Sequence, residues 1–442
     1  MRPAIRPETS WRFPDPDIHR LPNGQEVWVF NLPGQHVAAI ELVIPVPLSY
    51  EPRLLEGVAS IALSSADEGT FSSPDGRITE LLELEGAVMQ GVASIHHSRL
   101  GCDAPARRLP KVMELFGEVV REPAFAAEDV AHHVALHIAG YESRAATPSA
   151  VTRQAFRAAL HGAENREGRP SSGTPATLAA ITPADVHAWH RTRWVPDGSV
   201  LVLAGDLRTT DLTAILATLA TWELPGGPSE VVGSSEQPPA VVIHDMPESV
   251  QATIQVGCIT PGRRHPDWAA LKLAGHAVCG AFASRLNVEL RERRGFTYGV
   301  QGGFTAHRSD GRFTVGASFR TEVAGEAVAR LLDGLALDEP FTTDEIADAR
   351  RFLVGIAPLA NETASDIARQ AAQLAGAGER PSFVNEHFDA MLRVNSDEAT
   401  SAYLAHVAPD RLTMAVSGPA VDLVPALTRI GLQPVVVNPP TP

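Results

Sequence analysis

Apolar runs of strand length and longer stretches of helical period follow one another in the same order in the two halves of the chain. The strand-like runs lie at residues 27–30 and 40–45, and again at 241–244 and 253–257. Helix-like stretches follow at residues 55–66 and 268–279. Each half closes with a further helix-like stretch and a buried apolar strand, at residues 200–204 and 413–416. Strands followed by helices predict an α+β fold of layered domains, each with a mixed or antiparallel sheet covered by helices.

The two halves also align with each other as an internal repeat. At an offset of 213 residues, Pro196 falls on Pro409 and Gly205 on Gly418. At an offset of 214 residues, near the other end of the unit, Pro33 falls on Pro247. Two nearly equal offsets at opposite ends of one unit indicate that a whole domain was duplicated. The alternative is a chance match between two unrelated strand-turn patterns.

A segment rich in proline, glycine and serine separates the two copies. It occupies residues 224–240, where apolar periodicity disappears. Such a composition is typical of an exposed linker. We therefore expect an N-terminal domain at residues 1–223 and a C-terminal domain at residues 241–442.

Composition limits the partners and the compartment of the chain. The 442 residues are 44% hydrophobic and 20% charged, as in water-soluble globular proteins. A formal net charge of −15 argues against a nucleic-acid partner, which needs a basic surface. The three cysteines lie far apart in the sequence, which fits a reducing compartment better than a disulfide framework. No apolar segment is long enough for a membrane span, so we expect a cytoplasmic protein without a membrane partner.

Short motifs in both halves resemble the pitrilysin-like (inverzincin) metallopeptidases. The second half carries Ser284-Arg285-Leu286, Leu290-Arg291-Glu292, Gly295 and Tyr298. The first half carries Gly173-Thr174, Ile181-Thr182, Asp185 and Pro196, followed by Gly205-Asp206. The resemblance covers nearly the full length. It implies two homologous domains joined by a linker, which together form half of a clamshell.

The zinc motif of that family is degenerate in this chain. The family pattern places H-x-x-E-H on a helix, so that two imidazoles bind Zn²⁺ and the glutamate serves as general base. The frame survives as Gly57-Val58-Ala59 and Gly69-Thr70, but Ser60, Leu63 and Ser64 stand where the family has His, Glu and His. The family's third ligand falls near His137, and Glu142 is the nearest carboxylate, about one helical turn too late. We therefore expect no metal and no cofactor in this chain, with zinc in a partner subunit.

Arg291 and Tyr298 keep the seven-residue separation that the family shows. We expect Arg291 near the end of a helix, Gly295 in the turn, and Tyr298 in a strand at residues 297–301. By resemblance, the two side chains donate hydrogen bonds to substrate carbonyls and to the oxyanion that forms at the zinc site. The alternative is structural, with Arg291 paired to Glu289 or Glu292 and Tyr298 half-buried in the strand.

Histidine pairs offer weaker candidates for a site. His133 and His137 lie one turn apart on a predicted helix, next to His132, but no carboxylate or cysteine at ligand spacing supports a metal site. His96 and His97 follow a strand-like run, and we expect them to be exposed.

Three functions remain open from the sequence. The resemblance favours a non-catalytic, zinc-free subunit of a heterodimeric metallopeptidase, which supplies Arg291 and Tyr298 to the zinc site of a homologous partner. Its substrate would be an unfolded peptide, either in general turnover or in removal of a leader segment. A degenerate family member with a binding or scaffold role is the second possibility. A stand-alone enzyme with an unrecognised metal site is the third.

Overall fold

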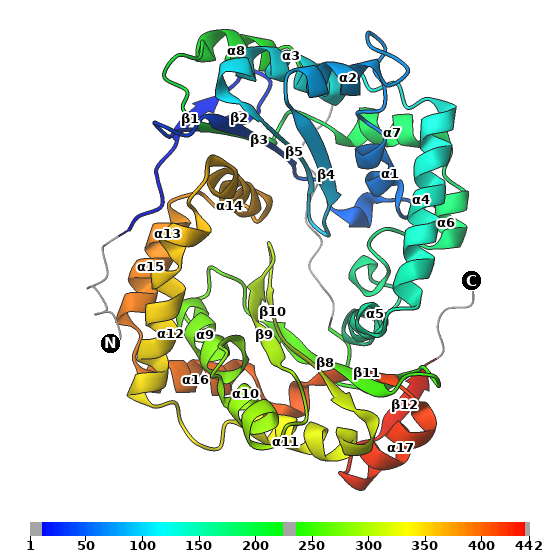
Figure 1. Cartoon of the computed structure of the whole chain (residues 1–442), viewed down its shortest axis with the longest axis vertical. Coiled ribbons are helices and arrows are strands. Elements are labelled where there is room, and N and C mark those ends of the chain that lie inside the picture. The colour runs from blue at the N-terminus through cyan, green and yellow to red at the C-terminus, as the bar shows by residue number, and fades with distance from the viewer. Residues whose placement is uncertain (1–10, 224–235, 438–442) are drawn as a thin grey trace.

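The computed structural model describes residues 11–223 and 236–437, and the described residues form two six-stranded sheets (Figure 1). The strand orders are β1-β2-β6-β3-β5-β4 and β12-β7-β11-β8-β10-β9. The first sheet contains β1 (Asp17–Arg20), β2 (Glu26–Asn31), β3 (Val37–Ile44), β4 (Val88–Ala93), β5 (Ser98–Pro105) and β6 (Val200–Gly205). The second contains β7 (Val241–Asp245), β8 (Gln251–Thr260), β9 (Val300–Ala306), β10 (Gly311–Arg320), β11 (Thr413–Gly418) and β12 (Pro434–Val437).

The strand order confirms the predicted duplication and the α+β class. Strands β2, β6, β3, β5 and β4 correspond in order to β7, β11, β8, β10 and β9. In both sheets the first of these pairs is parallel and the next three are antiparallel. Only the outermost strand differs, because β1 precedes its neighbour and pairs antiparallel, whereas β12 comes from the end of the chain and pairs parallel.

Helices fill the connections between these strands. The first half contains α1 (Val58–Ser64), α2 (Arg77–Leu84), α3 (Leu109–Arg121), α4 (Ala127–Ala145), α5 (Pro148–His161), α6 (Pro175–Ala179), α7 (Pro183–Arg193) and α8 (Leu212–Leu219). The second contains α9 (Trp268–Gly275), α10 (Arg285–Asn287), α11 (Ala324–Ala336), α12 (Thr343–Gly355), α13 (Ala357–Ala360), α14 (Ala364–Gly376), α15 (Phe383–Arg393), α16 (Ser396–His406) and α17 (Ala420–Arg429). Within residues 11–223 and 236–437, no helix has the length and apolar character that a membrane crossing requires.

One helix from each half of the molecule packs on the sheet of the other half. Helix α14 packs on β3 and β6 of the first sheet, and α5 packs on β11 and β8 of the second (Figure 1). Strand β3 is apolar on both faces, so that Ile40 belongs to one core while Ala39 belongs to another that includes Ala368 and Ala371 of α14. The alanines let the helix approach the sheet closely. Each sheet is therefore buried on both faces.

Polar contacts also join the two halves. Arg312 of β10 is ion-paired with Glu167, and both side chains are nearly inaccessible to solvent. Thr152 of α5 and Ser417 of β11 share a hydrogen bond of 2.6 Å between their hydroxyl oxygens. The proposed linker at residues 224–240 lies mostly outside the described residues, so the domain boundaries stay a prediction.

The expectation that His96 and His97 are exposed is wrong. Both lie in the turn between β4 and β5, which packs against the second half of the chain. The His96 ring is 6% exposed and lies 5.4 Å from the ring of His307, measured between centroids. The ring of His97 packs on α14 so closely that a Cβ at Gly376 would lie 2.4 Å from its Cε1 atom. The turn is buried because it forms part of the contact between the halves.

Because His96 and His97 are held neutral by burial, we expect the folded chain to lose stability in mild acid. Burial lowers the pKa of both His96 and His97 from an ordinary 6.5 to about 4. Between these values the unfolded chain binds protons that the folded chain does not, so this contribution to stability is present above pH 6.5 and is lost as pH falls toward 4. We expect His96→Gln to flatten the dependence of the unfolding temperature on pH between 7 and 5. His19→Gln, in the outer strand β1, is the control, and equal slopes in both variants would contradict the prediction.

Candidate functional site

The helix that carries the degenerate motif, α1, begins at a buried carboxylate. Gly57 precedes it with a positive φ of 106°, and a Cβ there would lie 2.8 Å from the carbonyl oxygen of Ser172. The Oε1 atom of Glu51 accepts hydrogen bonds from the N–H groups of Gly57 and Ala59, at 3.0 and 3.1 Å. Glu51 therefore satisfies N–H groups that the first turn of a helix leaves unpaired. The predicted helix at residues 55–66 starts later than expected because of this turn.

An arginine holds the same carboxylate from its other side. Arg166 donates to Glu51 Oε2 from Nε at 3.0 Å and from Nη2 at 2.7 Å. The side chains of Glu51 and Arg166 are 0% and 4% exposed. Arg169 pairs in the same region with Glu56, at 2.6 Å. The sequence did not indicate these ion pairs, because the two partners of each pair are more than a hundred positions apart and follow no recognisable motif.

The motif positions lie on α1 as the alignment predicted. Ser60 and Ser64 are half-buried, whereas Leu63 is 4% exposed. The Oγ atom of Ser64 lies 3.1 Å from Nε2 of His137, which belongs to α4. The structure thus brings the fifth motif position together with the residue that was aligned to the third ligand. Glu142, further along α4, is exposed and forms no hydrogen bond or ion pair with these residues.

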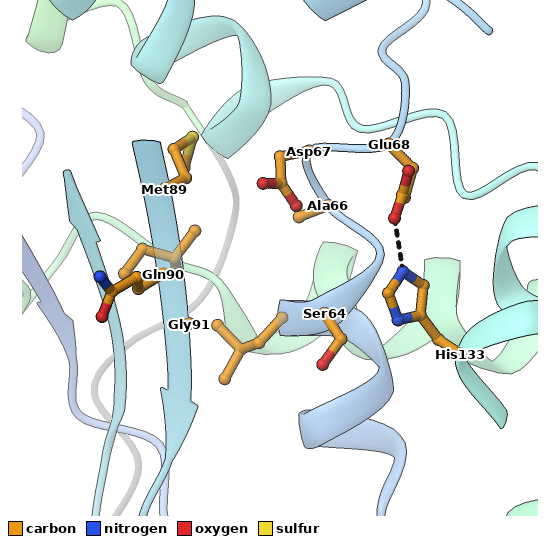
Figure 2. Close-up of a pocket in the computed structure, with 10 residues that line it drawn as sticks. Ser64, Ala66, Asp67, Glu68, Met89, Gln90, Gly91 and His133 are labelled. Carbon is orange, nitrogen blue, oxygen red and sulfur yellow. Dashed lines mark hydrogen bonds and ion pairs between the residues drawn. The ribbon is translucent and has the colours of Figure 1, made fainter. Parts of the chain in front are cut away.

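A cavity of about 310 Å³ opens between the end of α1 and the edge strand β4 (Figure 2). Its lining includes Leu63, Ser64, Ala66, Asp67, Glu68, Met89, Gln90, Gly91, Leu100 and His133. The Nε2 atom of His133 lies 2.7 Å from Oε1 of Glu68, a pairing that the sequence analysis did not anticipate. Burial raises the pKa of Asp67, which points into the space between Glu68 and Met89 in Figure 2.

The donors around this cavity do not reproduce a zinc site. A hydroxyl replaces each imidazole of the motif, and an alkyl group replaces the general base. Burial lowers the pKa of His137, and the nearby His133 and Arg144 lower it further. Among residues 11–223 and 236–437, no three histidine, cysteine or carboxylate ligand atoms converge here. The residues do not fit a catalytic zinc ion.

Restoring the motif should not restore a peptidase. We expect the triple variant Ser60→His, Leu63→Glu, Ser64→His to leave the chain alone without peptide hydrolysis, because His137 stands at the third-ligand position in place of the family's glutamate and the family's ligand set is not recovered. The measurement is cleavage of a quenched peptide in the presence of zinc, with the unmodified chain as control. Hydrolysis by the triple variant above the control would contradict this.

Arg291 lies in the second domain, on a helix that runs through α10 into a π-helical segment, Val288–Arg293. Its guanidinium carbon lies 3.8 Å from the ring centroid of Phe282, and its Nε lies 3.3 Å from Glu292. Phe282 is itself 71% exposed. The sequence left open a structural role in which Arg291 pairs with Glu289 or Glu292, and the structure shows the pair with Glu292. Because it also rests on an exposed ring, the guanidinium is held in place at the surface.

Tyr298 is 96% exposed, and it makes no hydrogen bond with any residue that the structure describes. The predicted strand at residues 297–301 is wrong at its start, since β9 begins at Val300. Thr297 explains the difference, because its hydroxyl accepts from the N–H of Gly299 at 3.1 Å and closes a bend. The tyrosine lies on this bend, and the half-buried strand position of the structural alternative is excluded.

Asn287 fixes the bend to the helix. Its Oδ1 accepts from the N–H of Val300 at 2.8 Å, and its Nδ2 donates to the carbonyl of Val300 at 3.0 Å. Its side chain is buried, with 4% of the residue exposed. Gly295 takes a positive φ of 62° in the turn between helix and bend, as predicted. Arg291 and Tyr298 are thus presented by one anchored unit, which makes no hydrogen bond, ion pair or ring contact with Ser60, Leu63 or Ser64.

Comparison with known protein families matches both halves of the chain. Residues 27–169 match the model described as Insulinase (Peptidase family M16). Residues 180–353 match the model described as Peptidase M16 inactive domain. The second match begins within the first domain, before α7 and β6, and continues into the second domain.

Individual relatives extend the similarity over most of the length. An uncharacterized zinc protease of Mycobacterium tuberculosis is 24% identical over 408 residues, which cover 90% of this chain and 92% of the relative. A solved peptidase M16 inactive domain from Pseudomonas fluorescens superposes with a TM-score of 0.85 at 24% identity, covering 92% of this chain and 98% of the other. A protease from Helicobacter pylori gives a TM-score of 0.83 at 16% identity, with coverages of 92% and 100%. These two structures establish the fold.

Proposed function

This chain belongs to peptidase family M16, the insulinase family, and from that membership we propose that it is the zinc-free subunit of a two-chain metallopeptidase. A homologous partner with an intact H-x-x-E-H motif carries the zinc ion and the general base. The present chain closes over the partner's site and contributes Arg291 and Tyr298. The substrate is an unfolded peptide.

The observation that carries this proposal is the contrast between the two halves of the site. The metal-binding positions on α1 hold Ser60, Leu63 and Ser64, whereas Tyr298 extends into solvent with its hydroxyl unused. An exposed phenol on the bend that follows the helix of Arg291, together with that residue's guanidinium, offers two hydrogen-bond donors for a ligand from outside the chain. Among the described residues, the Tyr298 side chain makes no hydrogen bond that would give it a structural role.

The chemical contribution of the pair is electrostatic. Zinc in the partner's H-x-x-E-H site would supply an activated water for peptide hydrolysis, and the residues of this chain would meet the negative charge that develops on the peptide carbonyl oxygen. A guanidinium and a phenol hydroxyl that are already oriented stabilise this charge without reorganising at the moment of reaction. The peptide itself extends along a strand edge of the partner, where main-chain hydrogen bonds give affinity with little sequence selectivity.

Peptide capture by an inactive complex tests this assignment. We expect the chain to form a 1:1 complex with an H-x-x-E-H homologue from the same genome, whose general-base glutamate has been changed to glutamine. Light scattering after size exclusion measures the stoichiometry, and fluorescence anisotropy measures binding of an unfolded peptide. Tight peptide binding by the complex that weakens in Arg291→Ala supports the proposal. A complex that binds no peptide would indicate a scaffold role instead.

A further inference from the structure

Three potential metal ligands meet in the second domain, away from both parts of the site described above. His265 and Asp267 lie immediately before α9, and His406 is the last residue of α16. One ligand atom from each of the three lies within 4.8 Å of the others. Among residues 11–223 and 236–437, this is the one group of three histidine, cysteine or carboxylate side chains with that spacing.

The fold holds these side chains together from distant parts of the chain. Helices α9 and α16 pack against each other, and Trp268 at the start of α9 shares the domain core with Tyr403 of α16. The backbone N–H of Leu271 donates to the carbonyl of Asp267 at 2.8 Å, which fixes Asp267 at the head of the helix. Asp267 and His406 are therefore positioned by packed helices, and His265 lies in the turn that leads into α9, where its carbonyl accepts from the N–H of Trp268 at 2.9 Å.

The distances suit a metal ion of the zinc type. Oδ2 of Asp267 lies 2.8 Å from Nε2 of His406 and 3.7 Å from Nδ1 of His265. Two ligands that each lie about 2.0–2.1 Å from one tetrahedral ion are roughly 3.3 Å apart. The two measured distances fall on either side of that value. Side-chain shifts of a few tenths of an ångström bring these two pairs to that separation, and the nitrogen atoms of the two histidines lie within 4.8 Å of each other.

The orientation of each donor also agrees with coordination. Asp267 occupies the N-cap position of α9, yet its carboxylate makes no cap hydrogen bond and is directed at His406 instead. Nδ1 of His265 accepts a hydrogen bond of 3.2 Å from the Asp267 N–H, so this nitrogen carries a lone pair. That bond is at the long end for a hydrogen bond, and a metal ion at Nδ1 would displace it and leave the Asp267 N–H to bond with water.

We propose that His265, Asp267 and His406 bind a divalent first-row transition metal ion such as Zn²⁺. Two imidazoles and one carboxylate are typical ligands of zinc, nickel, cobalt and copper, whereas Mg²⁺ and Ca²⁺ prefer oxygen ligands alone. The ion would link the start of α9 to the end of α16. The proposal departs from the sequence-based expectation of a chain without metal, which considered only the zinc motif of α1 and the histidines near it. It does not depend on the proposed peptidase role.

The direct test is a titration of the full-length, tag-free and metal-stripped chain with Co²⁺, whose visible absorption reports coordination. We expect one saturable site with a dissociation constant in the micromolar range, competed by Zn²⁺. His265→Ala, Asp267→Asn and His406→Ala should each weaken binding at least 10-fold. His133→Ala, which removes the histidine paired with Glu68, should leave it unchanged. Circular dichroism verifies that each variant is folded.

The unfolding temperature provides a second measurement of binding, with Zn²⁺ itself as the ligand. Because a ligand that binds only the folded state raises its stability, Zn²⁺ should raise the unfolding temperature of the unmodified chain and of His133→Ala, and not of His406→Ala. Equal Co²⁺ affinity in the ligand variants and the unmodified chain would overturn the proposal, as the net charge of −15 attracts cations without a site. Absence of saturable binding up to 1 mM Co²⁺, or loss of binding in His133→Ala alone, would overturn it too.

Discussion

Tyr298→Phe and Arg291→Ala should each lower peptide turnover by the mixed subunits about 10²-fold or more. The expected loss follows from removing one preorganised donor to an oxyanion, which costs about 2.7–4 kcal/mol in the transition state. Since Tyr298 is 96% exposed and without a hydrogen bond among the described residues, its hydroxyl contributes nothing to folding. Tyr298→Phe should therefore fold and assemble as the unmodified chain does, and Arg291→Ala should too, because its partners Glu292 and Phe282 are exposed and such surface contacts contribute little.

The measurement is kcat and kcat/KM for a quenched unfolded peptide at fixed subunit ratio. Loss of a donor to the oxyanion lowers kcat and kcat/KM together, and Arg291→Ala should also raise KM, because Arg291 contributes to peptide binding. Arg293→Ala is the matched control, because Arg293 lies on the same helix, is 70% exposed and pairs only with Glu289. Its turnover should equal that of the unmodified chain. Unchanged turnover in both Tyr298→Phe and Arg291→Ala would contradict the role assigned to the pair.

Arg166→Ala should lower the free energy of unfolding of the first domain by about 3–5 kcal/mol. This variant leaves the carboxylate of Glu51 buried without its cationic partner, and breaking one side of a buried ion pair carries a penalty of that size. Because Glu51 also receives the first N–H groups of α1, the start of that helix should loosen at the same time. Few other single changes should destabilise the chain as much.

Urea denaturation followed by circular dichroism measures this effect, and hydrogen exchange at residues 57–64 localises it. Arg53→Ala is the control, since the ion pair of Arg53 with Glu164 is exposed on both sides, with 52% and 93% of the side chains accessible. Exposed pairs of this kind contribute little, so the control should stay within about 0.5 kcal/mol. Equal denaturation midpoints for Arg166→Ala and Arg53→Ala would exclude a structural role for the buried pair.

The sequence was informative where burial and repetition determine the outcome. Strand β3 is apolar at every position but Glu41 because helices cover both faces of its sheet. The offset of 213 to 214 residues between the halves matches the equivalent strand orders. The alignment of His137 with a ligand position also held, since Ser64 and His137 are hydrogen-bonded. These features depend on periodicity and spacing, which a single sequence records.

The sequence was uninformative where contacts between distant segments decide the structure. Two contacts join residues more than a hundred positions apart. Glu51 pairs with Arg166, and His265 lies against His406. His96 has the local pattern of an exposed turn and is buried only because the second half packs on it. The strand expected at Tyr298 failed for a local reason, the hydrogen bond that Thr297 makes to its own backbone neighbour.

Peptide cleavage by the separate and mixed subunits tests the central claim most directly. The three samples are this chain alone, an H-x-x-E-H homologue from the same genome alone, and an equimolar mixture of the two, each with a quenched unfolded peptide. The divided site predicts cleavage in the mixture and none in either subunit by itself. Cleavage by this chain alone, or no cleavage in the mixture, would contradict it.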